Sequence, residues 1–183
     1  MASIINASTS AGLITTADTS GVLQLQSNGT TIATISSTGL STQVGAPAFS
    51  AYANAGVNVT AATFTKVQLN TEEFDTNSNF DSSTNYRFTP TVAGYYQVNA
   101  TLGFSTTSTI TRAIVLIYKN GSDYVTGNDI NASVNRLTVS SLIYMNGSTD
   151  YIELFGWVNG AGTLSFGGNR SITTMQASMV RSA

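Results

Sequence analysis

The densest group of side chains that could do chemistry is a set of acidic residues in an Asn/Ser/Thr-rich stretch: Glu72, Glu73, Asp75 and Asp81. Asp75, Asn77 and Asn79 have the alternating spacing of the first three oxygen ligands in an EF-hand calcium loop. That loop needs Gly at its sixth position and a bidentate Glu at its twelfth, where this chain has Phe80 and Tyr86. The stretch is therefore not an EF-hand.

A looser calcium site stays open, because Ca²⁺ accepts irregular cages of oxygen atoms. Its ligands would be Asp75, Asn77, Asn79 and Asp81, completed by oxygens from another copy of the chain. The alternative is a solvated loop whose Asp and Asn side chains accept hydrogen bonds from their own backbone. We favour the loop, and we expect no cofactor.

The residues required for common catalytic sites are missing. The chain has no Cys and no His, which removes thiol nucleophiles, Cys/His metal sites and His-based triads. A glycosidase could use two carboxylates, but the neighbours Glu72 and Glu73 would point to opposite faces of a strand. Trp157, with Tyr151 and Phe155 at the same parity, could stack on a sugar, although such aromatics more often fill a core or an interface. We expect a protein that is not an enzyme.

Composition narrows the possible partners further. Of 183 residues, 42% are apolar and only 9% are charged, with a net charge of −2 and no Lys/Arg cluster. Nucleic-acid binding needs a positive surface, so we expect no nucleic-acid partner. No run of eighteen apolar residues and no charged-then-apolar N-terminus occurs, so we expect neither a membrane span nor an export signal.

The elements that must position these residues are strands. From Gly94 to Ser105 apolar and polar residues alternate with a period of two, as in a strand with one buried and one wet face. Asn120-Gly121, Asn146-Gly147 and Asn159-Gly160 are typical of hairpin turns, and no window has helical periodicity. The sequence predicts an all-β sandwich or jelly roll with ten strands. They are Ala48–Asn54, Thr65–Leu69, Tyr86–Thr89, Tyr95–Ser105, Arg112–Lys119, Asp123–Thr126, Leu137–Met145, Tyr151–Val158, Thr163–Phe166 and Thr173–Arg181.

Two of these segments break the alternation. Ala113–Tyr118 (AIVLIY) is apolar at both parities, and Tyr151–Val158 (YIELFGWV) nearly so. A strand covered on both sides has this pattern, and the second cover would be another subunit or, alternatively, a long loop of the same chain. We take the first interpretation and expect an oligomer. The expected interface residues are Tyr95, Ile114, Leu116, Tyr118, Phe155 and Trp157.

Residues 1–46 differ in composition from the rest and carry a single charge, Asp18. Val22–Gln26 and Thr31–Ile35 flank Asn28-Gly29, which is the sequence signal of a hairpin. Because an isolated hairpin is marginally stable in water, we expect this segment to be stabilised by contact with a larger assembly. The alternative is a flexible tail. We therefore divide the chain into an attachment segment, 1–46, and a head domain, 47–183. The expected attachment residues are Val22, Leu23, Leu25, Ile32 and Ile35.

Several pieces of residues 47–183 resemble the globular head of the complement C1q family, a ten-strand jelly roll related to tumour necrosis factor. They are PAFSA, the Phe-Asp pair before a turn, YRFTPTVAGYYQV, YKNG and DYIELFGWVNG, in that order. The resemblance implies a tight homotrimer with one sheet of each protomer facing the threefold axis. Val98 stands where the family usually has an aromatic residue, and no collagen-type stalk precedes the head, so the animal complement role is not implied.

The N-terminal stretch ADTSGVLQLQSNGTTIATISSTG resembles β-rich segments in virion proteins of tailed bacteriophages, where they often precede a terminal knob. Together the two resemblances imply a non-enzymatic virion protein that assembles in the host cytoplasm. Our first hypothesis is a homotrimeric capsid decoration (cement) or short head-fibre protein, which binds the major capsid protein or another virion protein. The alternative is a tail-fibre tip adhesin that binds a host surface glycan or receptor. A secreted complement-like lectin would need the export signal that this N-terminus lacks.

Overall fold

A computed structural model of the chain consists of strands, turns and loops, with no helix among the residues it describes. These are residues 3–8, 12–16, 19–39, 41–43, 45–105 and 110–183, with side chains described for 19–39, 45–105 and 110–183. The all-β class is confirmed. The chain divides into two compact units, Met1–Ala46 and Pro47–Ala183, which we call the N-terminal unit and the head.

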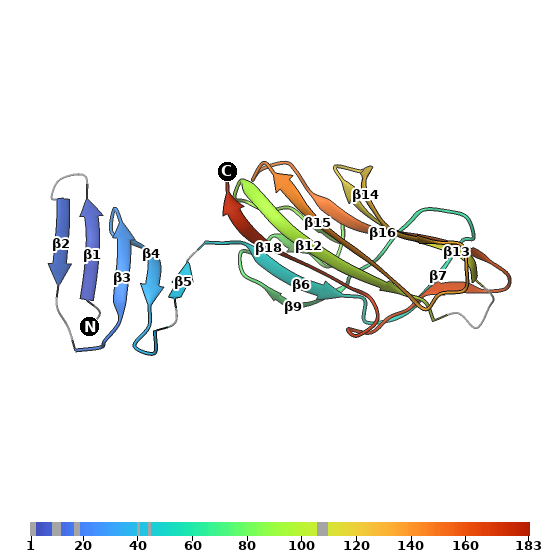
Figure 1. Cartoon of the computed structure of the whole chain (residues 1–183), viewed down its shortest axis with the longest axis horizontal. Coiled ribbons are helices and arrows are strands. Elements are labelled where there is room, and N and C mark those ends of the chain that lie inside the picture. The colour runs from blue at the N-terminus through green and yellow to red at the C-terminus, as the bar shows by residue number, and fades with distance from the viewer. Residues whose placement is uncertain (1–2, 9–11, 17–18, 40, 44, 106–109) are drawn as a thin grey trace. The chain divides into compact units, whose positions relative to one another are not determined.

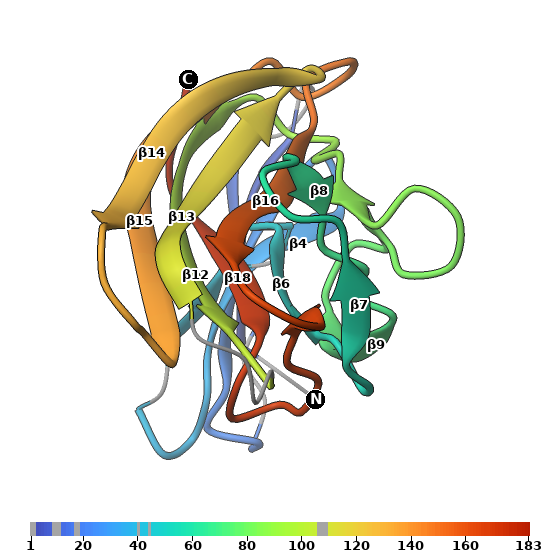
Figure 2. The same cartoon turned by 90° about the vertical axis from the view of Figure 1, so that its right-hand side faces the viewer.

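The head is a sandwich of two antiparallel sheets (Figures 1 and 2). Sheet I has the order β15-β12-β18-β6-β9, and its strands are β6 (Ala48–Tyr52), β9 (Thr71–Asp75), β12 (Gly94–Gly103), β15 (Arg136–Met145) and β18 (Thr174–Ser182). Sheet II has the order β10-β11-β16-β13-β14, with β8 beside β16. Its strands are β8 (Thr65–Lys66), β10 (Phe80–Asp81), β11 (Arg87–Phe88), β13 (Ile110–Lys119), β14 (Ser122–Ile130) and β16 (Ile152–Gly160). A separate ribbon pairs β7 (Val57–Val59) with β17 (Leu164–Phe166).

The connections pass repeatedly from one sheet to the other, as in a jelly roll: β12 lies in sheet I and β13 in sheet II, and β15 and β16 are divided in the same way. Asn120 (φ 53°) and Gly121 (φ 78°) make the predicted tight hairpin turn between β13 and β14. Asn146-Gly147 instead lies in a corner between the sheets, where the Asn146 side chain accepts the N–H groups of the next residues. The turn predicted at Asn159-Gly160 is wrong, because both residues belong to β16.

Four aromatic rings form the centre of the core between the sheets. Phe49 stacks on Phe80 and Phe88, with ring centroids 4.7 and 4.5 Å apart, and Phe88 meets the edge of Tyr96 at 5.7 Å. All four are buried, and the Tyr96 hydroxyl donates to Val92 O over 2.7 Å. Burial raises the pKa of Tyr96 to about 12, so this phenol stays protonated and keeps its hydrogen bond at physiological pH.

All ten predicted segments contain a strand, whereas β7, β9 and β10 were missed. β9 reads TEEFD, with charge at both parities, and most of its side chains are exposed. It is a strand because β6 offers it a free edge, with Phe49 opposite Asp75. Pairing of this kind depends on a distant partner, so local composition could not reveal it.

The N-terminal unit is one five-stranded sheet with the order β2-β1-β3-β4-β5 (Figure 1). Its strands are β1 (Ser3–Ser8), β2 (Gly12–Thr16), β3 (Leu23–Ser27), β4 (Thr30–Ile35) and β5 (Ser41–Gln43). The predicted hairpin is present, with Asn28 (φ 49°) and Gly29 (φ 78°) between β3 and β4. β1 pairs parallel with β3, and β1, β2 and β5 lie outside the predicted hairpin.

Candidate functional site

The outward face of β12, β15 and β18 in sheet I is uncharged along most of its length, and we call it the neutral face. Arg136 and Arg181 stand at its two ends, and no other acidic or basic residue lies on these three strands. Cross-strand pairing aligns Tyr95 with Tyr144, Gln97 with Leu142 and Asn99 with Ser140. Its members are Tyr95, Gln97, Asn99, Thr101, Thr138, Ser140, Leu142, Tyr144, Thr174, Gln176, Ser178 and Val180.

The middle of the neutral face is polar, and its groups bond one another. Gln97 Nε2 donates to Ser140 Oγ over 3.0 Å, and Ser140 Oγ donates to Asn99 Oδ1 over 2.8 Å. Hydrogen bonds already made on the surface need not be replaced when another protein covers them. This ladder can therefore be buried at a smaller cost than free amides or charges.

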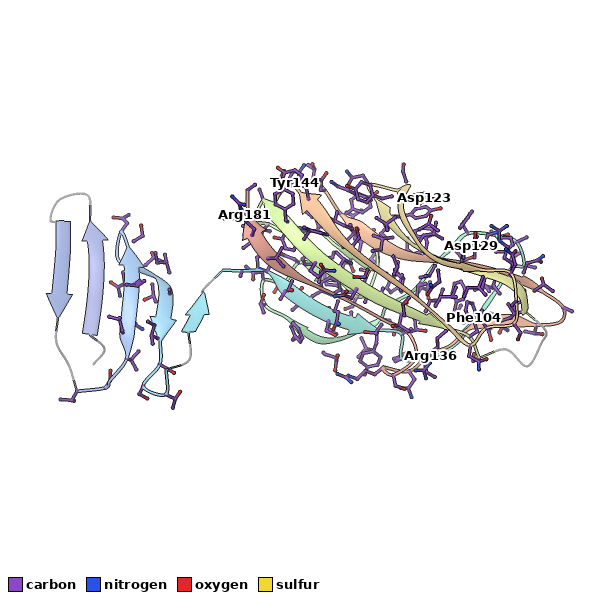
Figure 3. The ribbon with its side chains drawn as sticks, in the orientation of Figure 1. Phe104, Asp123, Asp129, Arg136, Tyr144 and Arg181 are labelled. Carbon is purple, nitrogen blue, oxygen red and sulfur yellow. The ribbon has the colours of Figure 1, made fainter. Side chains whose placement is uncertain are left out.

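One end of the neutral face is apolar, and we call it the apolar end: Tyr95, Leu142, Tyr144 and Val180. These side chains keep 42%, 55%, 41% and 57% of their surface exposed. The rings of Tyr95 and Tyr144 lie 5.5 Å apart, and a hollow beside them is lined by Tyr95, Leu142, Val180 and the last three residues of the chain. Figure 3 shows Tyr144 and Arg181 together at this end of the head. Clustered apolar side chains of this kind mark an interaction surface.

The apolar end lies next to the start of the head. The Met179 N–H donates to Pro47 O over 3.0 Å, so the first residue of the head is held beside the C-terminal part of β18. At the C-terminus, the Ala183 N–H donates to Ala93 O over 3.1 Å. Pro47, the first residue of the head, therefore lies near the apolar end.

The outward face of sheet II is different, because its aromatic and charged groups engage one another. Tyr118 and Phe155 stack with centroids 3.8 Å apart. Arg112 forms a bidentate pair with Asp129, with N–O distances of 2.9 and 2.7 Å, and lies over the ring of Trp157. The Arg112 guanidinium lowers the pKa of Asp129.

Two further ion pairs occupy sheet II. Lys66 Nζ lies 2.5 Å from Glu153, whose carboxylate is buried, and Lys119 Nζ lies 2.9 Å from Asp150. The pKa of Asp150 is lowered, mainly by the hydrogen bond from the Asn120 side chain and to a smaller extent by Lys119. Because these charges find partners within the head, this face has less need of an external partner than the neutral face.

The predicted interface residues fall on both sheets. Tyr95 belongs to the apolar end, whereas Ile114, Leu116, Tyr118, Phe155 and Trp157 share the outward face of sheet II. Ile114 and Leu116 are only 7% and 1% exposed within the single chain. Their burial is therefore explained inside one protomer, and the doubly apolar run does not by itself require a second copy.

The apolar end contains three residues that were not among the predicted interface residues: Leu142, Tyr144 and Val180. Within Leu137–Met145, the odd positions Leu137, Val139, Ile143 and Met145 are buried and the even positions are exposed. Leu142 and Tyr144 continue the solvent-facing positions of Thr138 and Ser140, and large apolar residues at such positions were the signal that could have revealed this surface.

Side chains of the candidate calcium loop accept hydrogen bonds from the backbone. Asp75 accepts the N–H groups of Asn77 (3.2 Å) and Phe80 (2.6 Å), and Asn79 Oδ1 accepts the Thr91 N–H. The Asp81 carboxylate accepts the N–H groups of residues 83, 84 and 85. Bonds from Thr84 and Ser83, and then from Asn85, hold the pKa of Asp81 well below its usual range. Oxygens surrounded by N–H donors fit the loop interpretation, and no group of three acidic side chains gathers in the described part of the chain.

Four of the expected attachment residues lie in the β3–β4 hairpin, and Val22 immediately precedes it. Leu23 and Leu25 pair with Ile35 and Ala33, and Ile32 lies at a bulge between two sections of the register. Leu25, Ile32 and Ile35 are 37%, 49% and 39% exposed. Val22 precedes β3 and is half-buried. No helix in the described residues is long and apolar enough to span a membrane.

Comparison with known proteins supports the fold. No family model matches the sequence, and no curated protein sequence matches it. Among solved structures, the chain is similar to the globular domain of zebrafish complement 1qA, with a TM-score of 0.55, 15% identity, and coverage of 75% of this chain and 99% of that one. PRD1 vertex protein P5 gives a TM-score of 0.54 and 18% identity, covering 74% and 97% of the two chains. Murine APRIL gives 0.54 and 9%, covering 74% and 99%. The head therefore has the jelly-roll fold of C1q-like and TNF-like domains.

Proposed function

We propose that this chain is a non-enzymatic structural protein of a phage particle. In this proposal it is a homotrimer that decorates the capsid, as a cement or short head-fibre protein, and is anchored through residues 1–46. The fold shared with a phage vertex protein supports a virion role, as does the N-terminal resemblance to phage virion segments. Its partners would be two further copies of itself and the major capsid protein or another virion protein.

The observation that carries the self-association is the apolar end. Four exposed apolar side chains lie beside a polar ladder whose groups bond one another. The charges next to them are Arg181 and Lys119, and Lys119 Nζ is already bonded to Tyr144 O and paired with Asp150. Another protein can therefore cover this surface without burying an unpaired lysine. Arg181 stands at the border, where its guanidinium can stay in water or reach the neighbouring copy. We therefore place the main contact between copies on the neutral face; the sheet II residues, which are engaged within the protomer, are a secondary part of the interface.

Anchoring through the N-terminal unit follows from the division of the chain. The head has its own closed core, so it can fold without residues 1–46. The N-terminal unit is a single-layer sheet in which no described side chain is buried, so it gains most by binding something else.

The test compares the full chain with a variant that lacks residues 1–46, each mixed with particles that lack the protein. Both should be trimeric by light scattering, and only the full chain should sediment with the particles. If the shortened head still binds the particles, residues 1–46 are not the anchor.

A second function, an adhesin at a tail-fibre tip, is favoured by a different observation. Phe64 is 46% exposed and its ring lies 6.4 Å from that of Trp157, next to the Arg112–Asp129 pair. Aromatic rings beside a charged fork can hold a host glycan. The copy number per particle separates the two functions: many copies over the head would exclude the adhesin, and a few copies at the tail would exclude decoration.

A further inference from the structure

The β3–β4 hairpin of the N-terminal sheet has one apolar face, which stays partly exposed in the described part of this unit. Leu23 pairs with Ile35, and Leu25 pairs with Ala33, so these four side chains lie on the same side of the β3–β4 hairpin. Among residues 19–39 none is buried, and Leu25 and Ile35 remain 37% and 39% exposed. A sheet with an apolar face needs a second layer to be stable in water.

The composition of this sheet favours an identical sheet as that second layer. Asp18 is the only acidic or basic residue among residues 1–46. Identical faces bring like charges together, and like charges facing each other are destabilising. A face of Leu, Ile and Ala has no such cost, because it has no charge to repel its own copy or to leave unpaired.

The tether to the head brings identical sheets together. β5 ends at Gln43 and the head begins at Pro47, so the two units are joined by three residues with a reach of roughly 14 Å. Pro47 is bonded to β18 beside the apolar end, where we place the contact between heads. Heads that associate there hold their N-terminal sheets at an effective concentration of about millimolar.

We propose that the face formed by Leu23, Leu25, Ala33 and Ile35 packs against the same face of the other copies in the trimer. This second self-association rests on the proposed association of the heads. The opposite face of the hairpin, with Gln24, Gln26 and Thr34, then points away from the other copies and is available to the particle. The chain would bind the particle through this face of Gln24, Gln26 and Thr34, together with Ile32 at the bulge, and not through the apolar face of the hairpin.

The absence of Cys from the chain makes a direct test possible. Leu25→Cys places a single thiol on the apolar face, and the matched control Gln24→Cys places one on the opposite face. Under mild oxidation of the full-length protein, a disulfide forms only where two Cα atoms of different copies come within about 7 Å. In a trimer, about two thirds of the Leu25→Cys chains can be joined in pairs, because the third thiol is left without a partner.

We expect disulfide-linked dimers from Leu25→Cys on a non-reducing gel, and few from Gln24→Cys. Equal linking of both variants, or no linking of Leu25→Cys while light scattering gives a trimer, would overturn this inference and leave the trimer proposal intact. A monomeric mass for the unoxidised protein would instead overturn the association of the heads, and this inference with it. If Leu25→Cys does not fold, Ala33→Cys repeats the test at the paired position, with Thr34→Cys as its control.

Discussion

The carboxylate of Asp81 stabilises its loop by accepting backbone N–H groups, of which those of Thr84 and Ser83 lie at 2.9 and 3.0 Å. These bonds are strongest when the carboxylate is charged, so they lower its pKa in the folded state relative to the unfolded value of about 3.9. A group with a depressed folded pKa contributes stability above its unfolded pKa and loses it as the pH falls through its folded pKa.

Asp81→Asn is therefore expected to destabilise the protein at pH 7, and the difference from the parent should shrink as the pH falls from about 5 toward 2. Urea unfolding of both proteins at several pH values measures this. A difference in unfolding free energy that does not change with pH would contradict the assigned role of the charge.

Gly156 in β16 lies against side chains of β12 and β17. A Cβ atom at this position would be 2.4 Å from Leu102 Cδ2 and 2.6 Å from the Phe166 ring. Both neighbours are buried, so they have little room to move.

Gly156→Ala should cost about 1–3 kcal/mol of stability through overpacking. Thermal and urea unfolding measure the loss. In the double variant Gly156→Ala/Leu102→Ala the removed side chain makes room, so the total loss should be smaller than the sum of the two single losses. Strict additivity would exclude the clash as the cause.

At the scale of elements, β15 separates the core from the interaction surface by parity alone. Its odd residues, such as Ile143 and Met145, are fully buried, and its even residues, such as Leu142 and Tyr144, are exposed. A substitution at an even position can therefore change association without disturbing the core.

Leu142→Glu is expected to separate the copies, because it places an unpaired charge in the proposed contact between heads. Burying this unpaired charge should cost about 3 kcal/mol or more of association free energy, so the association constant should fall by roughly two orders of magnitude or more. Light scattering over a dilution series measures it. The matched control is Tyr124→Glu, which changes a residue that is also exposed (51%) but lies on β14 of sheet II. This variant should remain associated. Equal effects of the two variants would refute the neutral face as the contact.

At the scale of the whole molecule, the distribution of charge separates two kinds of surface. Ion pairs such as Arg112–Asp129 and Lys66–Glu153 lie on sheet II, and the neutral face has none between its ends. Association through the neutral face would be apolar in character, and apolar contacts are not screened by salt.

We expect the apparent melting temperature to rise with protein concentration, because association stabilises the folded state by mass action. The oligomeric mass should stay unchanged between about 0.05 M and about 1 M salt. Dissociation at high salt would indicate that charged groups, and hence the sheet II face, hold the copies together.

Local sequence patterns are enough to locate ten strands of the head and the hairpin of the N-terminal unit. Alternation over Gly94–Ser105 and the dipeptides Asn28-Gly29 and Asn120-Gly121 are local signals, and the backbone follows them locally. The ordered pieces that resemble the C1q family predicted the jelly roll as well. Strands such as β9, which exist only through pairing with a distant edge, could not be found in this way.

Which apolar residues are already covered, and which remain exposed, follows only from the packing of the folded chain. Leu116 and Leu142 both read as apolar strand residues, yet one is 1% and the other 55% exposed. The difference arises from which sheet each strand joins and which side chains surround it there, since burial depends on neighbours that are far apart along the chain.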